Sequence, residues 1–559
     1  MSVGEKLAAP RNLHIAVNAQ RSGQRAAAPR AERWASAATL TLSVLAVALR
    51  FFFWYYTRRT WEDALITVQH AENAALGLGL THVPGGPRIH GFTSPLSVLI
   101  PLLGEWVHHG FGLPLLKFVS AICGGITVWL AMRICQRLGA AFPITLLVGG
   151  YLAIEHQQLL FGMAGMETQI AVTVLLLSIY SLFDFRPILI GVSLALCMLA
   201  RPDFCFWTLL VAGLVGWRCR KKHDWGALET VAVALLLIYG PWIVFTTWYY
   251  GNPIPNTILA KAWGFGSWYA SLSPSAFVLK LWERTRFIFA ILSPAYGGNG
   301  TGYAFFSFDP RGTISVVVLM FAAAGTVVAW RTRSIPGLAI AGFVVVYSAY
   351  YLFLVSVVAL WYCIPLAAIA IMAAGLGVNA MLHACFRGRW RAIAGYAVAL
   401  AYLASLAAIM PQTFRGERDV QRFVEEGVRK EVGLYLASVM GPKQTVGCEP
   451  LGYIGYYSRH VVYAYPGMCN REVVRFVHQH PKQRNLIDML AYFRPDYIAL
   501  RPMEYRRGLR TGNYWLTTEY QKAAIFRTPE QERLQLLFPN DNLDTEFYVL
   551  KRTSAGGEP

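Results

Sequence analysis

The stretch Thr60-Trp61-Glu62-Asp63-Ala64-Leu65-Ile66-Thr67 places two adjacent carboxylates just beyond the first long apolar segment, residues 35–56. That segment ends in aromatic and basic residues, which are typical of a membrane interface. Ionisable groups at such a boundary usually pair or take part in chemistry. The alternative is a solvated pair near the positive N-terminus of the following helix. We interpret the rest of the chain as a scaffold that presents this pair.

Composition indicates a membrane protein. Of the 559 residues, 55% are hydrophobic and only 14% are charged, whereas an ordinary soluble domain has about 25% charged residues. The net charge of +19 does not indicate a nucleic-acid-binding protein, because many Lys and Arg residues lie in short loops between apolar segments. In that position they set the orientation of the chain in the bilayer.

The apolar segments predict eleven transmembrane spans, since about 20 apolar residues cross the hydrocarbon core. The predicted spans are 35–56, 113–134, 144–161, 168–183, 188–199, 204–217, 228–248, 314–330, 338–358, 361–383 and 393–409. We interpret the apolar stretch 95–106 as an interfacial helix that does not cross. The basic loops between later spans then all lie on the side of the basic N-terminus, as the positive-inside rule requires. This topology places the N-terminus inside and the C-terminus outside.

Three regions follow from this topology. Residues 1–33 are basic and have no apolar run, which predicts a disordered cytoplasmic arm and argues against a cleaved signal peptide. Residues 34–410 form the membrane domain, with external loops 57–112 and 249–313. Residues 411–559 are more polar and predict an extracytoplasmic α/β domain.

Local patterns fill in this C-terminal region. They predict a helix over 420–440 and another near 485–492, with strands at 445–447, 460–463 and 497–500. Cys448 and Cys469 are the two cysteines of the region, and a disulfide between them is compatible with an extracytoplasmic location.

Six motifs occur along the chain in one order. They are Glu62-Asp63-Ala64 with Gly91-Phe92-Thr93-Ser94-Pro95, Gly165-Met166-Glu167-Thr168, Ala200-Arg201-Pro202-Asp203, Pro255-Asn256-Thr257 with Lys261, Trp361-Tyr362-Cys363-Ile364-Pro365, and Gly452-Tyr453-Ile454-Gly455-Tyr456-Tyr457-Ser458. This order resembles GT-C membrane glycosyltransferases, especially the terminal arabinofuranosyltransferases of cell-wall arabinogalactan and their bacterial relatives. The resemblance implies a mainly α-helical, multi-pass GT-C protein of the bacterial inner (plasma) membrane.

The resemblance also implies a reaction. A sugar, with arabinofuranose as the best single guess, moves from a polyprenyl-phosphate carrier to a hydroxyl of a cell-envelope glycan or glycoprotein on the external face. The alternatives are hexose or mannose transfer to protein or lipid, and a transporter of lipid-linked saccharides. Against a transporter, the ionisable residues gather at one face and no internal symmetry is visible. The implied partners are this donor, the acceptor and membrane lipid; no cofactor is certain, and a divalent cation stays open.

The implied catalytic residues are Asp63, as general base for the acceptor hydroxyl, and Glu62 beside it. Cationic or amide groups are needed for the leaving phosphate, and we predict Lys261, Arg201 and Asn256 for this role. Simpler interpretations stand beside two of these. Lys261 also suits an interfacial lysine, and Arg201 a local pair with the acid two residues further on.

Contacts to the sugar or acceptor are predicted for His90, Glu167, Trp361 and Tyr362. Glu167 also suits a helix N-terminus, His90 a loop histidine, and the aromatic pair an interfacial belt. His90 and His156 lack ligand-like spacing to any other histidine or carboxylate, so we predict no metal site built from protein side chains.

Overall fold

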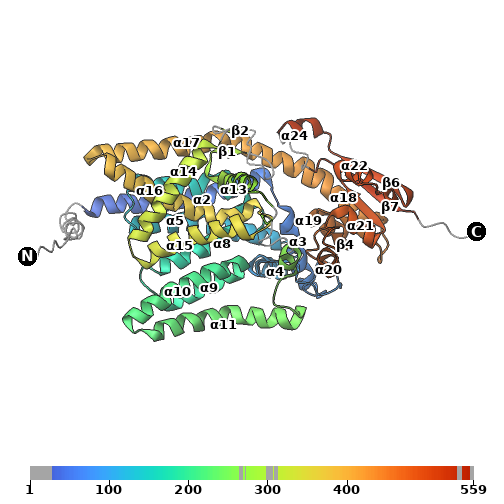
Figure 1. Ribbon diagram of the computed structural model, residues 1–559, viewed down its shortest axis with the longest axis horizontal. Helices are drawn as coiled ribbons and strands as arrows, with labels where there is room; N and C mark the ends of the chain where they lie inside the picture. The colour runs from blue at the N-terminus through green and yellow to red at the C-terminus, as the bar shows by residue number, and fades with distance from the viewer. Residues whose placement is uncertain are drawn as a thin grey trace, which may run out of the picture.

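The computed structural model describes residues 28–262, 269–270, 272–296, 306–307, 312–537 and 544–553. A large helical bundle occupies one end and a smaller α/β unit the other (Figure 1). Most of the predicted basic arm, residues 1–27, lies outside the described residues. Its last residues belong to the first described helix, α2 (Ala28–Thr57).

Apart from 144–161, each predicted span lies mostly within one helical stretch. After α2 the helices of the bundle are α5 (Gly112–Arg137), α6 (Phe142–Ile154), α7 (His156–Met163), α8 (Thr168–Ser181), α9 (Pro187–Ala200), α10 (Cys205–Lys222), α11 (Trp225–Tyr250), α14 (Thr313–Arg331), α15 (Ile335–Ala349), α16 (Leu360–Cys385) and α17 (Gly388–Val420). Within the described residues, seven helical stretches are long and apolar enough to cross a membrane, and an eighth is counted if α7 and α8, bent by 109°, form one span. The chain is a multi-pass membrane protein.

The predicted span 144–161 is wrong as a single helix. It breaks at Glu155, whose side chain accepts hydrogen bonds from the backbone N–H groups of Gln157 and Gln158 at 3.0 and 2.8 Å. These bonds cap a new helix, α7, because they satisfy donors that its first turn leaves open. The apolar pattern alone does not reveal this break.

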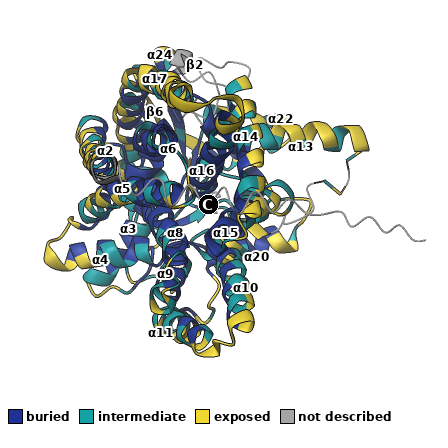
Figure 2. Cartoon of the chain, turned by 90° about the vertical axis from the view of Figure 1, so that its left-hand side faces the viewer, coloured by how far each residue is buried: buried dark blue, intermediate teal, exposed yellow. Residues whose placement is uncertain are grey.

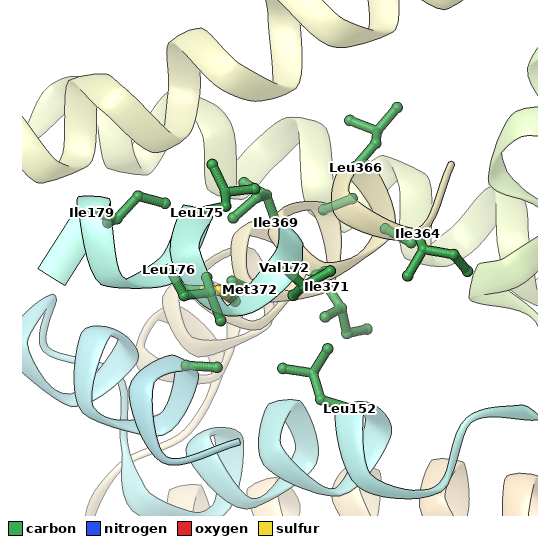
Figure 3. Packing of buried hydrophobic residues seen from close by; sticks show 14 of the residues in the cluster. Leu152, Val172, Leu175, Leu176, Ile179, Ile364, Leu366, Ile369, Ile371 and Met372 are labelled. Atoms are coloured by element: carbon green, nitrogen blue, oxygen red, sulfur yellow. The ribbon is translucent and has the colours of Figure 1, made fainter. Parts of the chain in front are cut away.

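Helix α16 lies near the centre of the bundle and is buried along most of its length (Figure 2). Leu152 of α6, Leu175 of α8 and Ile369 of α16 belong to the core that Figure 3 shows. At the rim, Leu237 of α11 is 71% exposed, as expected for a side chain that faces lipid.

Two helices of the first loop lie at the end of the bundle that meets the α/β unit, α3 (Glu62–Ala75) and α4 (Leu96–Val107) (Figure 1). Helix α4 is the predicted interfacial helix. Its 12 residues span about 18 Å, which is too short to cross about 30 Å of hydrocarbon. The second loop contributes α12 (Asn256–Lys261) and α13 (Pro274–Phe289), with the short strands β1 (Ala295–Tyr296) and β2 (Phe306–Ser307).

The α/β unit contains a five-stranded sheet of order β4-β3-β5-β7-β6. Its strands are β3 (Thr445–Cys448), β4 (Val461–Ala464), β5 (Tyr497–Leu500), β6 (Tyr520–Arg527) and β7 (Glu546–Arg552). Strand β3 pairs in parallel with β4 and β5, whereas β7 runs antiparallel to β5 and β6. The three predicted strands are confirmed as β3, β4 and β5.

The helices of this unit complete the fold. They are α18 (Lys430–Val439), α19 (Gly452–Ser458), α20 (Arg471–Gln479), α21 (Leu486–Phe493), α22 (Pro502–Arg510), α23 (Trp515–Thr518) and α24 (Gln531–Leu537). Helix α21 corresponds to the helix predicted near 485–492. Cys448 and Cys469 are both free. Their thiols approach the carbonyl oxygens of Pro450 and Gly91 instead of each other.

No loop separates the bundle from the α/β unit. Helix α17 continues through a π-helical segment, η5 (Gln421–Arg429), into α18, so that residues 388–439 form one helical stretch. The predicted boundary at 410/411 therefore lies inside a helix. π-Helical turns are rare and often mark functional sites.

The α/β unit also packs directly on the first loop, through α19 against α3. The backbone N–H of Gly452 donates to Glu62 Oε1 at 3.0 Å. Arg459 Nη2 donates to Glu72 Oε2 at 2.7 Å, and the Tyr456 hydroxyl donates to the same carboxylate. The Gly-Tyr-Ile-Gly-Tyr-Tyr-Ser motif is thus the docking helix of this unit.

Replacement of Gly452 by alanine should disturb this docking. A Cβ at that position would lie 2.1 Å from the carbonyl oxygen of Glu62, so two backbone segments must separate. We expect a loss of about 1–3 kcal/mol in the free energy of unfolding, seen as a lower Tm and faster proteolysis between the two parts. Gly441→Ala is the matched control, because its Cβ would meet only Gln444 Oε1 at 3.8 Å. Equal Tm values for the two variants would contradict the close contact.

Candidate active site

Five predicted residues line one small cavity of about 60 Å³. They come from four separate places in the chain: Asp63 from the first turn of α3, Glu167 from the turn before α8, Lys261 from the end of α12, and Trp361 and Tyr362 from the start of α16. The structure thus brings one predicted acid–base group, one predicted phosphate ligand and three predicted sugar contacts together.

The Asp63 carboxylate is available for chemistry. In the part of the chain that the structure describes, its side chain makes no hydrogen bond or ion pair. Burial raises its pKa above the ordinary value, whereas the Lys261 ammonium opposes that rise. A carboxylate with a raised pKa is a stronger base, and it acts best when its pKa lies near the working pH.

Lys261 supplies positive charge to the same cavity. Its ammonium donates to the Tyr362 hydroxyl at 3.0 Å. Burial alone would lower the pKa of Lys261, but Tyr362, Asp63 and Glu167 together raise it above the ordinary value. Lys261 is therefore protonated at neutral pH, and its ammonium carries the charge needed to hold an anion.

Arg201 does not line this cavity and pairs with Asp203. Its Nε and Nη2 atoms donate to the two carboxylate oxygens of Asp203 at 3.0 and 3.1 Å. The guanidinium also lies 5.3 Å from the centre of the Tyr362 ring and 3.9 Å from Glu167. The simpler interpretation of Arg201, a local pair with Asp203, is therefore present. In this arrangement Arg201 positions Tyr362 and Glu167, and contact with a phosphate stays a prediction.

Asn256 holds the backbone of the α/β unit. Its side-chain amide donates to the carbonyl oxygens of Gly467 and Met468 at 2.8 and 3.0 Å, so both amide hydrogens are used. Asn256 does not line the Asp63 cavity, although the next residue, Thr257, does. Its predicted role as a phosphate ligand does not fit this geometry.

The Glu62 side chain contacts η5 and the α/β unit. Its Oε2 lies 3.1 Å from Arg429 Nη1, and its Oε1 accepts from Gly452. Burial raises the pKa of Glu62, and the Arg429 guanidinium opposes this rise. The predicted acidic pair is thus divided between two tasks, because Asp63 faces the cavity and Glu62 joins the docking contact.

His90 lies outside the Asp63 cavity. Its ring stacks on Tyr250 at a centroid distance of 4.8 Å with 4° between the planes. The residue after it, Gly91, lines the cavity, whereas His90 lines a separate pocket on the other side of this segment.

A second, larger cavity of about 650 Å³ adjoins the first and shares Asp63, Trp361 and Met468 with it. One part of its lining is apolar, formed by Leu160, Phe161, Phe287, Val357, Val358 and Leu360. Another part carries charged residues of η5 and the α/β unit, among them Arg429, Arg501 and Asp544. Asp63 therefore lies at the junction of the small cavity and the larger one, whose lining is partly apolar and partly charged.

The sequence did not predict the ion pairs that these charged residues form. Arg429 Nε lies 2.6 Å from Asp544 Oδ2, and its Nη1 lies 2.9 Å from Glu425 Oε2. Arg501 also contacts Asp544. These residues are up to 119 positions apart in sequence, so no local motif connects them. They join η5 to the sheet and hold Glu62 in place.

Replacement of Arg429 by glutamine should leave Glu62, Glu425 and Asp544 without this partner. Breaking a buried pair on one side costs about 3–5 kcal/mol, which should appear as a marked fall in Tm. Arg422→Gln, on the exposed face of the same π-helix, is the control and should change Tm little. A similar Tm for both variants would show that the network does not hold the two parts together.

Among the described residues, no group of three or more His, Cys, Asp and Glu side chains is arranged to hold a metal ion.

Solved structures with the same architecture identify the fold. ArnT from Cupriavidus metallidurans, bound to undecaprenyl phosphate, aligns with 92% of this chain and 99% of its own at a TM-score of 0.51 and 13% identity. Its apo form gives 0.51 at 12% identity. The apo oligosaccharyltransferase from Archaeoglobus fulgidus aligns with 86% of this chain and 70% of its own, at a TM-score of 0.50 and 12% identity. The chain therefore has the GT-C membrane fold.

Residues 416–546 match the model of a domain of unknown function, DUF8728. This match covers η5 and most of the α/β unit. No curated protein is significantly similar to the sequence.

Proposed function

We propose that this protein is a glycosyltransferase that moves a sugar from a polyprenyl-phosphate carrier to a hydroxyl group. One observation carries the proposal: a half-buried Asp63 carboxylate with no bonding partner among the described residues lines the same cavity of a GT-C fold as the protonated Lys261. A general base and a cation for a leaving phosphate are the two groups that this transfer requires.

The reaction can be written with these groups. Asp63 accepts the proton of the acceptor hydroxyl while the hydroxyl oxygen bonds to the anomeric carbon of the donor sugar. The bond from that carbon to the phosphate oxygen breaks, and its electron pair leaves with the polyprenyl phosphate. Lys261 stabilises the negative charge that grows on this phosphate. The products are the glycosylated acceptor, polyprenyl phosphate and a protonated Asp63.

The larger cavity suits the rest of the donor. Its apolar wall, which includes Phe161, Phe287 and Leu360, begins beside Trp361, and Trp361 also lines the Asp63 cavity. A prenyl chain attached to a phosphate at Lys261 would lie along this wall. The similarly folded ArnT structure was solved with undecaprenyl phosphate bound, which supports a lipid of this class.

The finer assignment rests on the sequence motifs. We propose arabinofuranose as the transferred sugar and a hydroxyl of a cell-envelope glycan or glycoprotein as the acceptor. The proposed location is the bacterial inner membrane, with the N-terminus inside and the α/β unit outside, as the basic loops indicate. Because Lys261 supplies the positive charge, we expect transfer to continue in a chelator.

The test uses the purified protein in lipid nanodiscs with a panel of polyprenyl-phosphate sugars that differ only in the sugar. Consumption of the arabinofuranosyl donor alone, with release of polyprenyl phosphate, is the expected result. Preference for a hexosyl or mannosyl donor would retain the transferase and replace the sugar. If no donor is consumed with or without added Mg²⁺, and a lipid-linked saccharide instead crosses the bilayer of proteoliposomes, the transferase proposal fails.

A further inference from the structure

A groove separate from the Asp63 cavity runs between the α/β unit and the two external loops. It consists of two pockets of about 800 and 350 Å³. The pockets share Tyr250, Gly251, Arg471 and Arg475, so they form one continuous surface. Helix α20 provides one side of this groove, and the segments around His90 and Tyr250 provide the other.

The charge of the groove is positive. Three exposed arginines line it, Arg88, Arg471 and Arg475. Among the described residues, Glu472 is the one acidic residue of the lining. Arg471 Nη2 donates to the Tyr250 carbonyl at 2.5 Å, and the Arg88 guanidinium lies 4.6 Å from the centre of the Tyr249 ring. Arg475 has no ion pair or hydrogen bond to any described residue. Its guanidinium can bind an anion without breaking another contact.

A buried histidine points to a ligand independently of this charge. His90 is only 3% exposed and lines the smaller pocket. Within the described structure neither of its ring nitrogens has a hydrogen-bond partner, although buried polar groups are normally satisfied. Burial lowers the pKa of His90 to about 3. The ring is therefore neutral at physiological pH and offers one donor and one acceptor.

The groove and the Asp63 cavity lie on opposite sides of a thin wall. In the first loop, His90 faces the groove and Gly91 the cavity. In α12, Leu259 faces the groove and Lys261 the cavity. In the α/β unit, Cys469 faces the groove and Met468 the cavity. The groove is therefore a neighbour of the proposed transfer site and not part of it.

We propose that this groove is a second binding site, for an anionic saccharide. Arginine guanidinium groups bind carboxylate or phosphate in a forked geometry. The neutral His90 suits a sugar hydroxyl, which both donates and accepts. The tyrosine rings give the amphipathic lining on which ligand pockets rely. The proposal goes beyond the transfer reaction, because binding here requires neither a donor lipid nor Asp63.

The test is a binding measurement on the full-length protein in nanodiscs. The probes are three hexasaccharides: an oligogalacturonate with carboxylates, a glucose hexamer phosphorylated on its sugars, and the same glucose hexamer without charge. We expect at least one charged hexamer to bind at least tenfold more tightly than the neutral one, and added salt to weaken its binding. The tighter of the two charged probes identifies the anion.

Two variants locate the binding in the groove. Arg475→Gln and His90→Phe should each weaken the charged hexamer about tenfold, because each removes a hydrogen-bonding partner. Arg506→Gln removes an exposed arginine of α22 outside the groove and should bind normally. Equal binding of all three hexamers, or no effect of either groove variant in a normally folded protein, would overturn the proposal.

Failure of this proposal can be told apart from failure of the transferase. Asp63→Asn should bind the charged hexamer as the unaltered protein does. A protein that binds the hexamer but consumes no lipid donor would retain the groove and lose the proposed function. A protein that transfers sugar but binds no charged hexamer would do the reverse.

Discussion

Replacement of Asp63 by asparagine should lower the rate of sugar transfer by a factor of about 10²–10⁴, the usual contribution of a general base. The amide keeps the size of the side chain but cannot take the acceptor proton at neutral pH. Because the Asp63 carboxylate has no partner among the described residues, the change breaks no contact of the fold. Release of polyprenyl phosphate, measured with the preferred donor, checks the result, and an unchanged Tm confirms that the protein is folded.

Two comparisons sharpen this test. Glu532→Gln neutralises an exposed carboxylate of α24 and should leave the rate unchanged. Activity should also fall on the acid side of a pH profile, because Asp63 must be ionised to act. Since burial raises the pKa of Asp63, the midpoint of that fall should lie above the ordinary aspartate value of about 4. Transfer at the normal rate by Asp63→Asn would remove this residue as the base.

Replacement of Lys261 by methionine should lower the rate by a factor of about 10²–10³, the scale seen when one electrostatic stabiliser of a transition state is lost. Methionine keeps much of the length of the side chain but has no charge for the departing phosphate. The loss should appear mainly in kcat, because the charge on the phosphate grows as the bond to the sugar breaks. Single-turnover measurement with a saturating donor isolates this step.

Lys261 also donates to Tyr362, so a structural role must be separated from an electrostatic one. Tyr362→Phe removes the same hydrogen bond and leaves the ammonium in place. We expect this variant to keep most of the activity that Lys261→Met loses. Equal losses in the two variants would mean that Lys261 serves only to hold Tyr362, and the phosphate would then need another cation.

The fold could be predicted largely from the sequence because the bilayer imposes a length on every span. Apolar runs locate the helices, including the short helix at 95–106, which charge bias predicts not to cross. The break at Glu155 was missed, since a capping carboxylate inside an apolar run has no hydropathy signal of its own. Strands β6 and β7 were also missed. In the exposed strand β6, alternation is too weak to separate a strand from a loop.

The sequence predicts which residues form the site better than it predicts where each side chain points. Glu62 and Asp63 are neighbours in sequence, but successive residues of a helix point about 100° apart. Both line the larger cavity, whereas only Asp63 lines the small one. Asn256 and Lys261 lie on the same short helix, but Asn256 lines the groove and Lys261 lines the Asp63 cavity. Motif order identified which residues gather at this end of the bundle, whereas the direction of each side chain depended on packing against the α/β unit.

The unbroken helical stretch 388–439 fixes the α/β unit in rotation as well as in height. One residue added between 410 and 421 would turn everything beyond it by about 100° and carry Arg429 away from Glu62. Seven added residues would nearly restore the facing while lifting the unit by about 10 Å. A lift of this size would separate Gly452 from Glu62, so we expect neither partial-turn nor whole-turn insertions to be tolerated there.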